Sequence, residues 1–301
     1  MKRKNKIQIK TKTEKIFDVI IIIAVILLTI IFLYPFLYIL AVSFNDPSDT
    51  LKGGIVLWPR KFSTIAYETV FQNDSLLNAY GITIARTVIG SVTSVAFTGM
   101  FAYGLSKKRL MFRNFYFNLC IITMFFGGGL IPSVILIKNL GLTNNFLVYI
   151  IPALNSVFNM LVMKSFFNTL PASLEEAAKI DGCNDMGVFI KIVIPASLPI
   201  IATIMLFNAV GQWNTWMDAY LYVKDQNLMP LQTILQRILN QAEAQQTLKD
   251  LALGADVAAQ RITPQAVQLA TMVVSIGPIV AVYPFFQKYF VKGFLIGAVK
   301  E

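Results

Sequence analysis

Polar side chains inside otherwise apolar stretches are the residues of this chain best suited to chemistry. They are amides and tryptophans at short spacings: Asn155, Asn159, Asn208, Gln212, Trp213 and Trp216. Amides donate and accept hydrogen bonds and aromatic rings offer apolar faces, so the set suits the binding of a sugar. Two alternatives stay open: the amides pack helices together, or the tryptophans anchor the chain at a membrane surface.

Residues for catalysis are missing from this set. The chain has no His, which removes the commonest general base, the Ser-His and Cys-His nucleophiles and the His-ligated metals. No GxxxxGK[ST] motif occurs, so the chain does not cradle a nucleotide by itself. We therefore expect a non-catalytic protein that binds no metal and no cofactor. A disulfide between Cys120 and Cys183 is not expected either.

Composition assigns the chain to the membrane. Of its 301 residues 56% are hydrophobic and only 14% are charged, and the mean hydropathy is +0.63. A soluble protein of this size would need a more charged surface. Six apolar stretches are long enough to cross a bilayer as helices, at 19–44, 79–105, 115–137, 146–167, 192–213 and 264–286. The sequence thus predicts an all-α, multi-pass membrane domain over residues 19–290.

Breaks and charges inside these stretches carry further expectations. Residues 127–129 are all Gly and Pro132 follows, so the third stretch should be broken or kinked. Arg86 and Lys164 lie within predicted spans, and we expect them to snorkel to the outer and inner surfaces. The Ser and Thr residues of the second stretch are expected to pack helices together.

Basic residues predict the orientation of the chain. The head, 1–18, carries a net charge of +5, and the loop 106–114 has four Lys or Arg and no acid. The end of the chain is also basic, including the tail 291–301. Because such segments stay in the cytoplasm, both termini are expected there. The inner loop 168–191 is an exception, since it carries −2. A long, Gln-rich outer loop, 214–263, is expected to be partly helical.

The inner loop 171–195 has the pattern of a short, rigid helix. Ser173 and Glu176 fit a capping box, and Gly182 is placed to end the helix in the left-handed conformation. This predicts a helix over 173–180, a second short helical segment and a return to the membrane at Pro195. Such a helix could fit a groove on another protein, or it could be an ordinary capped loop helix.

The same loop resembles the EAA loop of bacterial ABC importer permeases. The resemblance rests on Glu176-Ala177-Ala178, on Gly182 and, after nine residues, on Ile192-Val193-Ile194-Pro195, where Ile194 replaces the Leu that is usual in the family.

Other segments resemble carbohydrate importers in particular. They are Trp213-Asn214-Thr215-Trp216, Pro230-Leu231-Gln232 and residues 283–293. The chain is similar to the smaller maltose-type permease and its oligosaccharide-importing relatives, from the first span to the C-terminus.

This resemblance implies a type I importer permease fold and a pathway subunit that brings a sugar, expected to be an oligosaccharide, across the bacterial cytoplasmic membrane. The implied partners are a second permease, two ATPases that hold ATP and Mg, and an extracellular or periplasmic sugar-binding protein; no nucleic acid is expected. The ATPase-coupling positions would be Glu175, Glu176, Ala177, Ala178, Asp181, Gly182, Ile192 and Pro195.

Two further expectations depend on this resemblance. The six polar residues named first would line the sugar pathway, and the acidic excess of the loop 168–191 would face the ATPase. The alternative function is a stand-alone ion-coupled secondary transporter. That class uses carboxylates within its spans, and the predicted spans contain no Asp or Glu.

Overall fold

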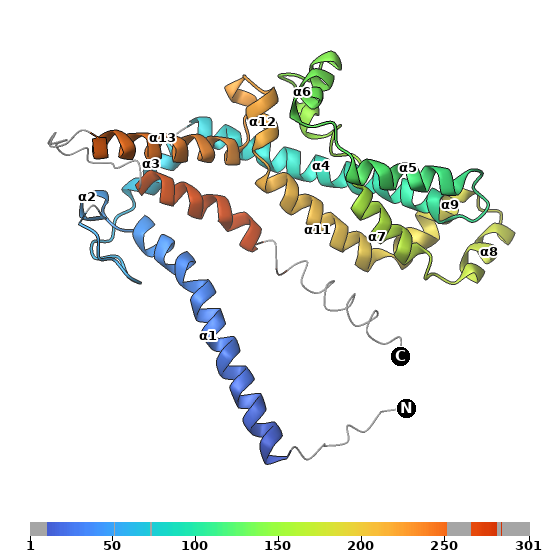
Figure 1. The fold of residues 1–301 in the computed structure, drawn as a ribbon, viewed down its shortest axis with the longest axis horizontal. Helices are drawn as coiled ribbons and strands as arrows, with labels where there is room; N and C mark the ends of the chain where they lie inside the picture. Colours follow the sequence, from blue (N-terminus) through green and yellow to red (C-terminus); the bar gives the residue numbers. More distant parts are fainter. Residues whose placement is uncertain (1–10, 51, 73, 252–265, 282–283, 285–301) are drawn as a thin grey trace. The chain divides into compact units, whose positions relative to one another are not determined.

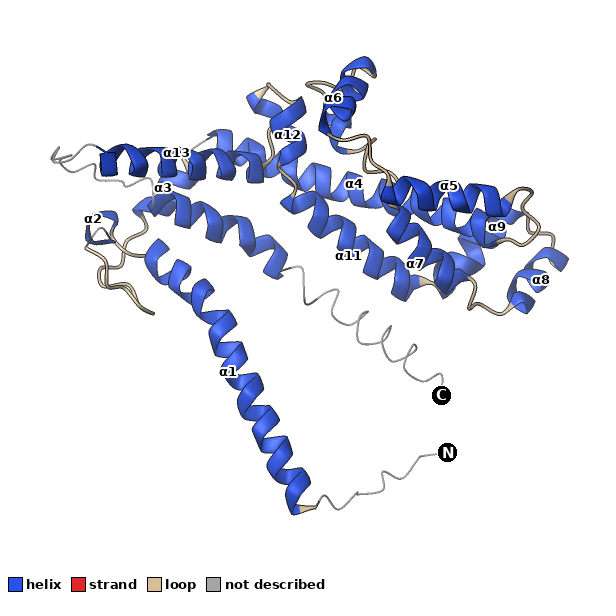
Figure 2. Cartoon of the chain, viewed as in Figure 1, coloured by secondary structure: helices blue, strands red, loops and turns tan. Residues whose placement is uncertain are grey.

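A computed structural model of the chain describes residues 11–50, 52–72, 74–251, 266–281 and 284. Within these residues the regular elements are helices, and one isolated antiparallel bridge joins Asn45 to Phe62 (Figure 2). The all-α prediction is thus confirmed. The chain divides into two compact parts, Met1–Val70 with Leu253–Val273 and Phe71–Ala252 with Val274–Glu301, which are described separately.

The first part begins with the long helix α1, Lys12–Ser43 (Figure 1). Thr11 caps it in a capping box: its hydroxyl accepts from the Glu14 amide, and the Glu14 carboxylate accepts from the Thr11 amide at 2.7 Å. The helix therefore starts before the apolar stretch predicted from residue 19. Its apolar side chains are largely exposed, as expected where lipid is the solvent. Two short helices, α2 (Pro47–Thr50) and α3 (Ile65–Phe71), follow.

The second part is built around α4, Asp74–Ser106. Helices α11 (Leu198–Asn214) and α7 (Val157–Phe167) pack along it (Figure 1). The side of α4 that faces them is buried and consists mostly of small residues: Thr83, Gly90, Ser91, Ser94, Thr98, Gly99 and Ala102. Small side chains let helix backbones approach closely, so most Ser and Thr residues here are packing residues, as expected.

The third predicted span is two helices, α5 (Arg113–Phe125) and α6 (Leu130–Asn139). Their axes differ by 117° across residues 126–129. Gly129 has φ of +84°, in the region that favours glycine. The break at the glycine run was predicted, and the bend is sharper than a kink.

The fourth predicted span is only partly helical, which corrects the range 146–167. A 3-10 turn, η1 (Phe146–Tyr149), comes first, and α7 begins only at Val157. Ser156 caps α7 by accepting a hydrogen bond from the Asn159 amide. Residues 150–156 are not helical, and they include Pro152, which cannot donate a backbone hydrogen bond.

The fifth predicted span, 192–213, is not one straight helix. A bend of 85° at Ser197 separates α11 from the preceding helical segment. That segment consists of α9 (Asp185–Val188), a π-helical turn η2 (Phe189–Val193) and α10 (Ile194–Ala196). Pro195 and Pro199 flank the bend and interrupt the backbone hydrogen-bond ladder.

The segment after α11 is helical in large part. It contains α12 (Met217–Tyr222), the 3-10 turn η3 (Gln226–Leu228) and α13 (Leu231–Leu251), which confirms the predicted helix in the Gln-rich loop. A last helix covers Ala266–Ala281. The head before residue 11, residues 252–265 and the tail lie outside the described residues.

Two described helices, α1 and α4, are each long and apolar enough to cross a bilayer. Each of two bent pairs, α5 with α6 and the segment Asp185–Ala196 with α11, could form one further span. Two other apolar helices, Val157–Phe167 and Ala266–Ala281, are shorter. The number of six spans therefore remains a prediction.

Candidate functional site

The predicted coupling loop forms helix α8, Ala172–Ile180. The predicted capping box is wrong: Pro171 is the N-cap, and Ser173 lies inside the first turn without a capping hydrogen bond. Pro171 precedes the helix in an extended conformation, with φ −59° and ψ 130°, and so starts the helix earlier than Ser173 would. Glu175 remains in the first turn, where the helix dipole favours a carboxylate.

The end of α8 is the one that the sequence predicted. Gly182 has φ of +85°. The Cys183 amide donates to the Ala178 carbonyl at 2.9 Å, and the Gly182 amide donates to the Lys179 carbonyl at 3.0 Å. This pair of hydrogen bonds is a Schellman motif, which requires the left-handed conformation at Gly182. The turn fixes the direction in which the chain leaves α8 for α9.

The adjacent residues Ala177 and Ala178 of α8 differ in burial. Ala178 is buried, packed with Val188 and Phe189 of the following segment. Ala177 and Glu176 are exposed, and Ile180 is 86% exposed. The helix thus has one face fixed to the rest of the second part and one free face that carries an apolar side chain.

The acids of this loop bind the basic loop that follows α4. Lys107 pairs with Glu175, and Arg109 pairs with Asp185, which also contacts Lys179 at 3.2 Å. These pairs account for the −2 charge that was an exception to the orientation rule. Glu175 and Asp185 thus form ion pairs within this chain, and the expectation that the acidic excess faces the ATPase stays a prediction.

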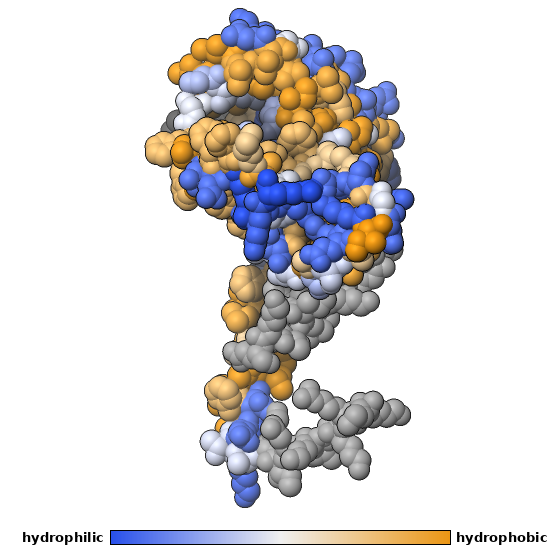
Figure 3. Space-filling model, turned by 90° about the vertical axis from the view of Figure 1, so that its right-hand side faces the viewer, coloured by the Kyte–Doolittle hydropathy of each residue, from blue (hydrophilic) through white to orange (hydrophobic). Residues whose placement is uncertain are grey.

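These ion pairs affect the titration of Asp185. The hydrogen bond from Arg109, together with that from Lys179, lowers the pKa of Asp185 below its ordinary 3.8. The stabilisation is complete above that pH and is lost as the pH falls toward the lowered value. Hydrophilic residues gather at the end of the second part that carries α8 and α9, and this end faces the viewer in Figure 3.

Lys107 connects the loop to an aromatic cluster under α4. Its ammonium lies 3.9 Å from the centre of the Tyr103 ring, a cation–π geometry. The Tyr103 ring lies 5.0 Å from that of Phe189 and 6.5 Å from that of Phe167. The end of α4, the end of α7 and the segment after α8 therefore form one packed unit.

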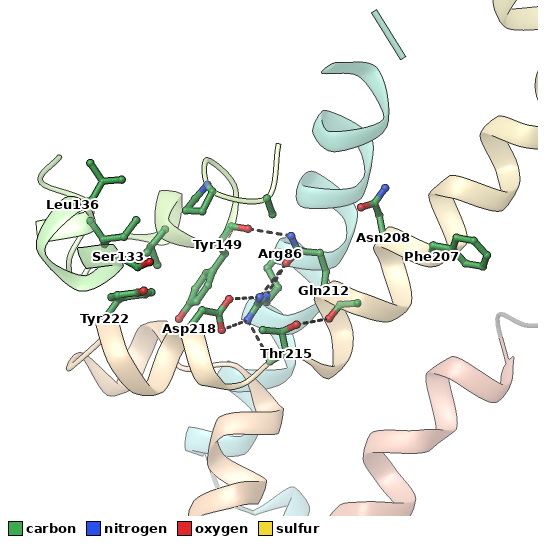
Figure 4. Close-up of a pocket in the computed structure, with 15 residues that line it drawn as sticks. Arg86, Ser133, Leu136, Tyr149, Phe207, Asn208, Gln212, Thr215, Asp218 and Tyr222 are labelled. Atoms are coloured by element: carbon green, nitrogen blue, oxygen red, sulfur yellow. Dashed lines mark hydrogen bonds and ion pairs between the residues drawn. The ribbon is translucent and has the colours of Figure 1, made fainter. Parts of the chain in front are cut away.

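A second candidate site is a cavity of about 510 Å³ near the other end of α4. Figure 4 shows its wall, which combines aromatic, amide and charged side chains from α4, α6, α11, α12 and η1. The lining includes Arg86, Ser133, Tyr149, Phe207, Asn208, Gln212, Thr215, Asp218 and Tyr222. Aromatic faces next to amides and hydroxyls suit a polyhydroxylated solute.

Arg86 does not snorkel outward, which corrects the prediction. The residue is only 1% exposed, and its guanidinium makes five hydrogen bonds. Two go to the Gln212 amide oxygen at 3.1 and 3.0 Å, one to the Thr215 carbonyl at 3.2 Å and two to the Asp218 carboxylate at 3.3 and 2.6 Å. All five N–H donors are thus used, which removes the reason to reach for water.

Gln212 and Tyr149 complete this network (Figure 4). The Gln212 amide nitrogen donates to the Tyr149 carbonyl at 3.0 Å, and the Arg86 guanidinium lies 4.3 Å from the Tyr149 ring centre. The Tyr149 hydroxyl donates to the Leu228 carbonyl at 2.8 Å. Gly90 makes room for Gln212: a Cβ at Gly90 would lie 2.8 Å from the Gln212 amide nitrogen.

Of the predicted pathway residues, Asn208 and Gln212 line this cavity. The other four do not. Asn155 is exposed in the segment before α7, whereas Asn159 is buried. Trp213 is buried, and its indole N–H donates to the Ser275 carbonyl at 3.1 Å. The Trp216 ring centre lies 6.0 Å from that of Tyr220. The two tryptophans are therefore packing residues, so far as the structure describes their surroundings.

Sequence reasoning missed Tyr149, Thr215, Asp218 and Tyr222 of the cavity wall. One signal was present, since a buried arginine in a membrane helix requires a carboxylate partner. Asp218 is the first acid after the fifth predicted span and could have been proposed on that basis. Lys164, the other charge within a span, has its ammonium 3.8 Å from the ring centre of Phe117.

Comparison with known proteins assigns the chain to a family. Residues 97–295 match the model described as "Binding-protein-dependent transport system inner membrane component". The chain belongs to this family. It is thus a permease-type membrane component of a transport system, and this family is one of non-catalytic components.

Relatives of this permease support the same assignment. It is 39% identical to a polygalacturonan/rhamnogalacturonan transport system permease protein of Bacillus subtilis, over 95% of this chain and 99% of the relative. It is 26% identical to an arabinooligosaccharides transport system permease protein of Halalkalibacterium halodurans, over 97% and 99% of the two chains.

The fold has a solved counterpart. A chain in the crystal structure of a bacterial ABC transporter involved in the import of the acidic polysaccharide alginate superposes with a TM-score of 0.84 and 30% identity. The match covers 94% of the permease and 99% of that chain. The predicted importer permease fold is therefore confirmed.

The close contact between Gly90 and the Gln212 side chain gives a first prediction. Replacing Gly90 with Ala should displace the Gln212 amide and cost about 1–3 kcal/mol, the usual effect of overpacking. The melting temperature of the purified chain in detergent measures this. The control is Gly81→Ala in the same helix, where a Cβ meets nothing within 4 Å, so it should not lower the melting temperature. Equal melting temperatures for both variants would contradict the network.

The pair between Lys107 and Glu175 gives a second prediction. Lys107→Glu and Glu175→Lys should each lower the melting temperature, because each puts like charges together. The double variant should recover most of the loss, with a coupling of about 0.5–1 kcal/mol for a partly exposed pair. Lys108→Glu is the control, since it makes the same charge change at an exposed position. Additive effects of the two changes would refute the pairing.

Proposed function

We propose that this permease is the pathway subunit of an ATP-driven importer for an oligosaccharide. The observation that carries the proposal is α8, a short helix with one face fixed to the second part and one free face, in a chain of the binding-protein-dependent family. The named cargoes of the relatives, polygalacturonan or rhamnogalacturonan, arabinooligosaccharides and alginate, are all carbohydrates, which supports the cargo class.

The free face of α8 is the proposed docking surface for an ATPase. Five of the predicted coupling residues are exposed: Glu176, Ala177, Asp181, Gly182 and Pro195. Ala178 is buried and Glu175 and Ile192 are half-buried, so these three support the helix rather than touch a partner. The exposed Ile180 adds an apolar side chain that the sequence analysis did not single out.

The support under α8 is what would transmit force. Glu175 holds Lys107, Lys107 covers Tyr103, and Tyr103 packs on Phe189. A push on α8 would therefore move the end of α4 instead of bending a loop. Because α4 also carries Arg86, the same helix reaches the cavity wall. In this proposal α4 moves the wall of the pathway, Asn208 faces the sugar, and Gln212 and Tyr149 hold Arg86 in that wall.

The remaining components follow from the family. A second related permease would complete the pathway, two ATPases would hold ATP and Mg, and an extracellular or periplasmic binding protein would deliver the sugar. The chain would lie in the bacterial cytoplasmic membrane with α8 and both termini in the cytoplasm. No cofactor is assigned to the chain itself.

A stand-alone ion-coupled transporter is not supported. The family is binding-protein-dependent. The carboxylate of the described cavity, Asp218, forms an ion pair with Arg86 and is therefore not a free coupling group.

The turn at Gly182 provides a test of the coupling role. Gly182→Val should cost about 1–3 kcal/mol of backbone strain and redirect α8, so uptake should fall while the protein still inserts. ATP hydrolysis should become less dependent on the binding protein. The measurement is sugar uptake and ATPase activity of the reconstituted complex.

Gly141→Val is a matched control for that variant. Gly141 also has positive φ, +68°, and a Cβ there also meets nothing within 4 Å. It lies in the turn after α6, away from the coupling loop. It should carry similar strain without loss of ATPase control. Unchanged sugar uptake by the Gly182→Val variant would contradict the coupling role. Sugar transport without ATP by a homodimer of this chain alone would contradict the whole proposal.

A further inference from the structure

An exposed apolar surface lies on the loop that follows α1. Its members are large side chains that are more than half exposed, namely Val56 (57%), Leu57 (53%), Trp58 (83%) and Phe62 (71%). Neither the coupling role nor the cavity uses them. We call this surface the Trp58 patch.

The backbone under the patch is ordered by hydrogen bonds to the end of α1. The Asp46 amide donates to the Lys61 carbonyl at 2.8 Å, and the Ser63 amide donates to the Phe44 carbonyl at 2.8 Å. The Lys61 amide donates to the Asn45 side-chain oxygen at 2.9 Å. The loop is thus a hairpin whose two arms are joined where α1 ends.

Arg60 closes the hairpin from inside. It donates to the Asp49 carboxylate at 3.0 Å, to the Asp49 carbonyl at 3.1 Å and to the Gly53 carbonyl at 2.7 Å. Burial would raise the pKa of Asp49, but the hydrogen bond from Asn45 and the charge of Arg60 lower it overall. These hydrogen bonds join Arg60 to Asp49 and Gly53, so the loop has a defined structure. Trp58 is therefore exposed on an ordered surface.

The patch is held at a definite level along α1. Ile55, which precedes it, is buried in a cluster with Ala41 and Val42 of the last turns of α1. At its other end the Phe62 ring stacks on Phe44, with centroids 5.5 Å apart. The patch therefore lies where the most apolar helix of the chain ends.

A helix as long and apolar as α1 is expected to cross a bilayer, so its end is expected near one of the two membrane surfaces. Between Ile16 and Leu40 the side chains of α1 are apolar and largely exposed, as expected where lipid surrounds a helix, and the patch adds exposed apolar side chains just beyond its end. Trp and Tyr are enriched at such membrane interfaces. The Tyr67 hydroxyl meets the Ser43 hydroxyl at 2.7 Å, and its ring stacks on Phe44, which adds a second amphipathic ring here.

Cationic groups border the patch on both sides in the sequence. Lys52, Arg60 and Lys61 are exposed. Lipid phosphate groups are anionic, so a Lys or Arg near the surface of an anionic membrane is attracted to it. Apolar rings with cations beside them match the boundary between acyl chains and headgroups.

We propose that the Trp58 patch inserts into the lipid headgroup region at the end of α1, on the side opposite the basic head, and fixes the depth of that helix. The partner is the lipid surface itself. The anchor would hold the first part of the chain still while the coupling loop moves the second.

Quenching by brominated phospholipids tests this. The full chain with its partner subunits is reconstituted in vesicles of phosphatidylcholine and phosphatidylglycerol, with bromine either near the headgroup or deep in the acyl chain. Comparison with the Trp58→Phe variant separates the fluorescence quenching of Trp58 from that of Trp213 and Trp216. We expect shallow bromine to quench wild type more than Trp58→Phe, and deep bromine to quench the two alike.

A second variant distinguishes loss of membrane contact from a folding defect. Trp58→Phe with Phe62→Trp moves the reporter to another exposed position of the patch and should restore shallow quenching. Equal shallow quenching of wild type and Trp58→Phe would overturn the proposal. The proposal would also be overturned if brominated lipids left the Trp58 fluorescence unchanged and only the sugar-binding protein altered it. The patch would then be a protein interface.

Discussion

A buried guanidinium sets the strongest constraint on the second part of this protein. An arginine left unpaired at the centre of a membrane helix costs about 2.5–3.5 kcal/mol on insertion scales. Arg86 avoids this cost by using Gln212 of α11, the Thr215 carbonyl and Asp218 of α12. Three segments must therefore meet at one point on α4, and the cavity forms beside that point. Gly90 is part of the same constraint, because any side chain there would occupy the space of Gln212.

The opposite end of α4 meets a different requirement. There the chain is in contact with water, and charges are arranged on the surface rather than buried. Lys107 and Arg109 neutralise Glu175 and Asp185, which keeps one face of α8 fixed and leaves the other free. One helix thus connects α8, the proposed ATPase-docking element, to the wall of the cavity. Because packed helices move as rigid bodies, this arrangement suits the alternating exposure of a pathway.

The first part of the chain is organised by its solvent. The side chains of α1 are apolar and exposed because lipid surrounds them, and the loop that follows exposes Val56, Leu57 and Trp58 for the same physical reason. Asn45 and Asp49 are buried there and hydrogen-bond to each other, and the exposed Arg60 donates to the Asp49 carboxylate. A soluble protein would show the reverse arrangement.

The sequence alone determined the features that depend on composition or on neighbouring residues. These include the membrane class, the all-helical fold, the break at residues 127–129 and the helix end at Gly182, because hydropathy and φ preferences act locally. Only the tertiary structure decided which polar residues meet. Arg86 and Asp218 are 132 residues apart in the chain, and Lys107 and Glu175 are 68 apart. It also placed the starts of α7 and α11 and excluded Trp213 from the cavity, since such outcomes depend on contacts between distant segments.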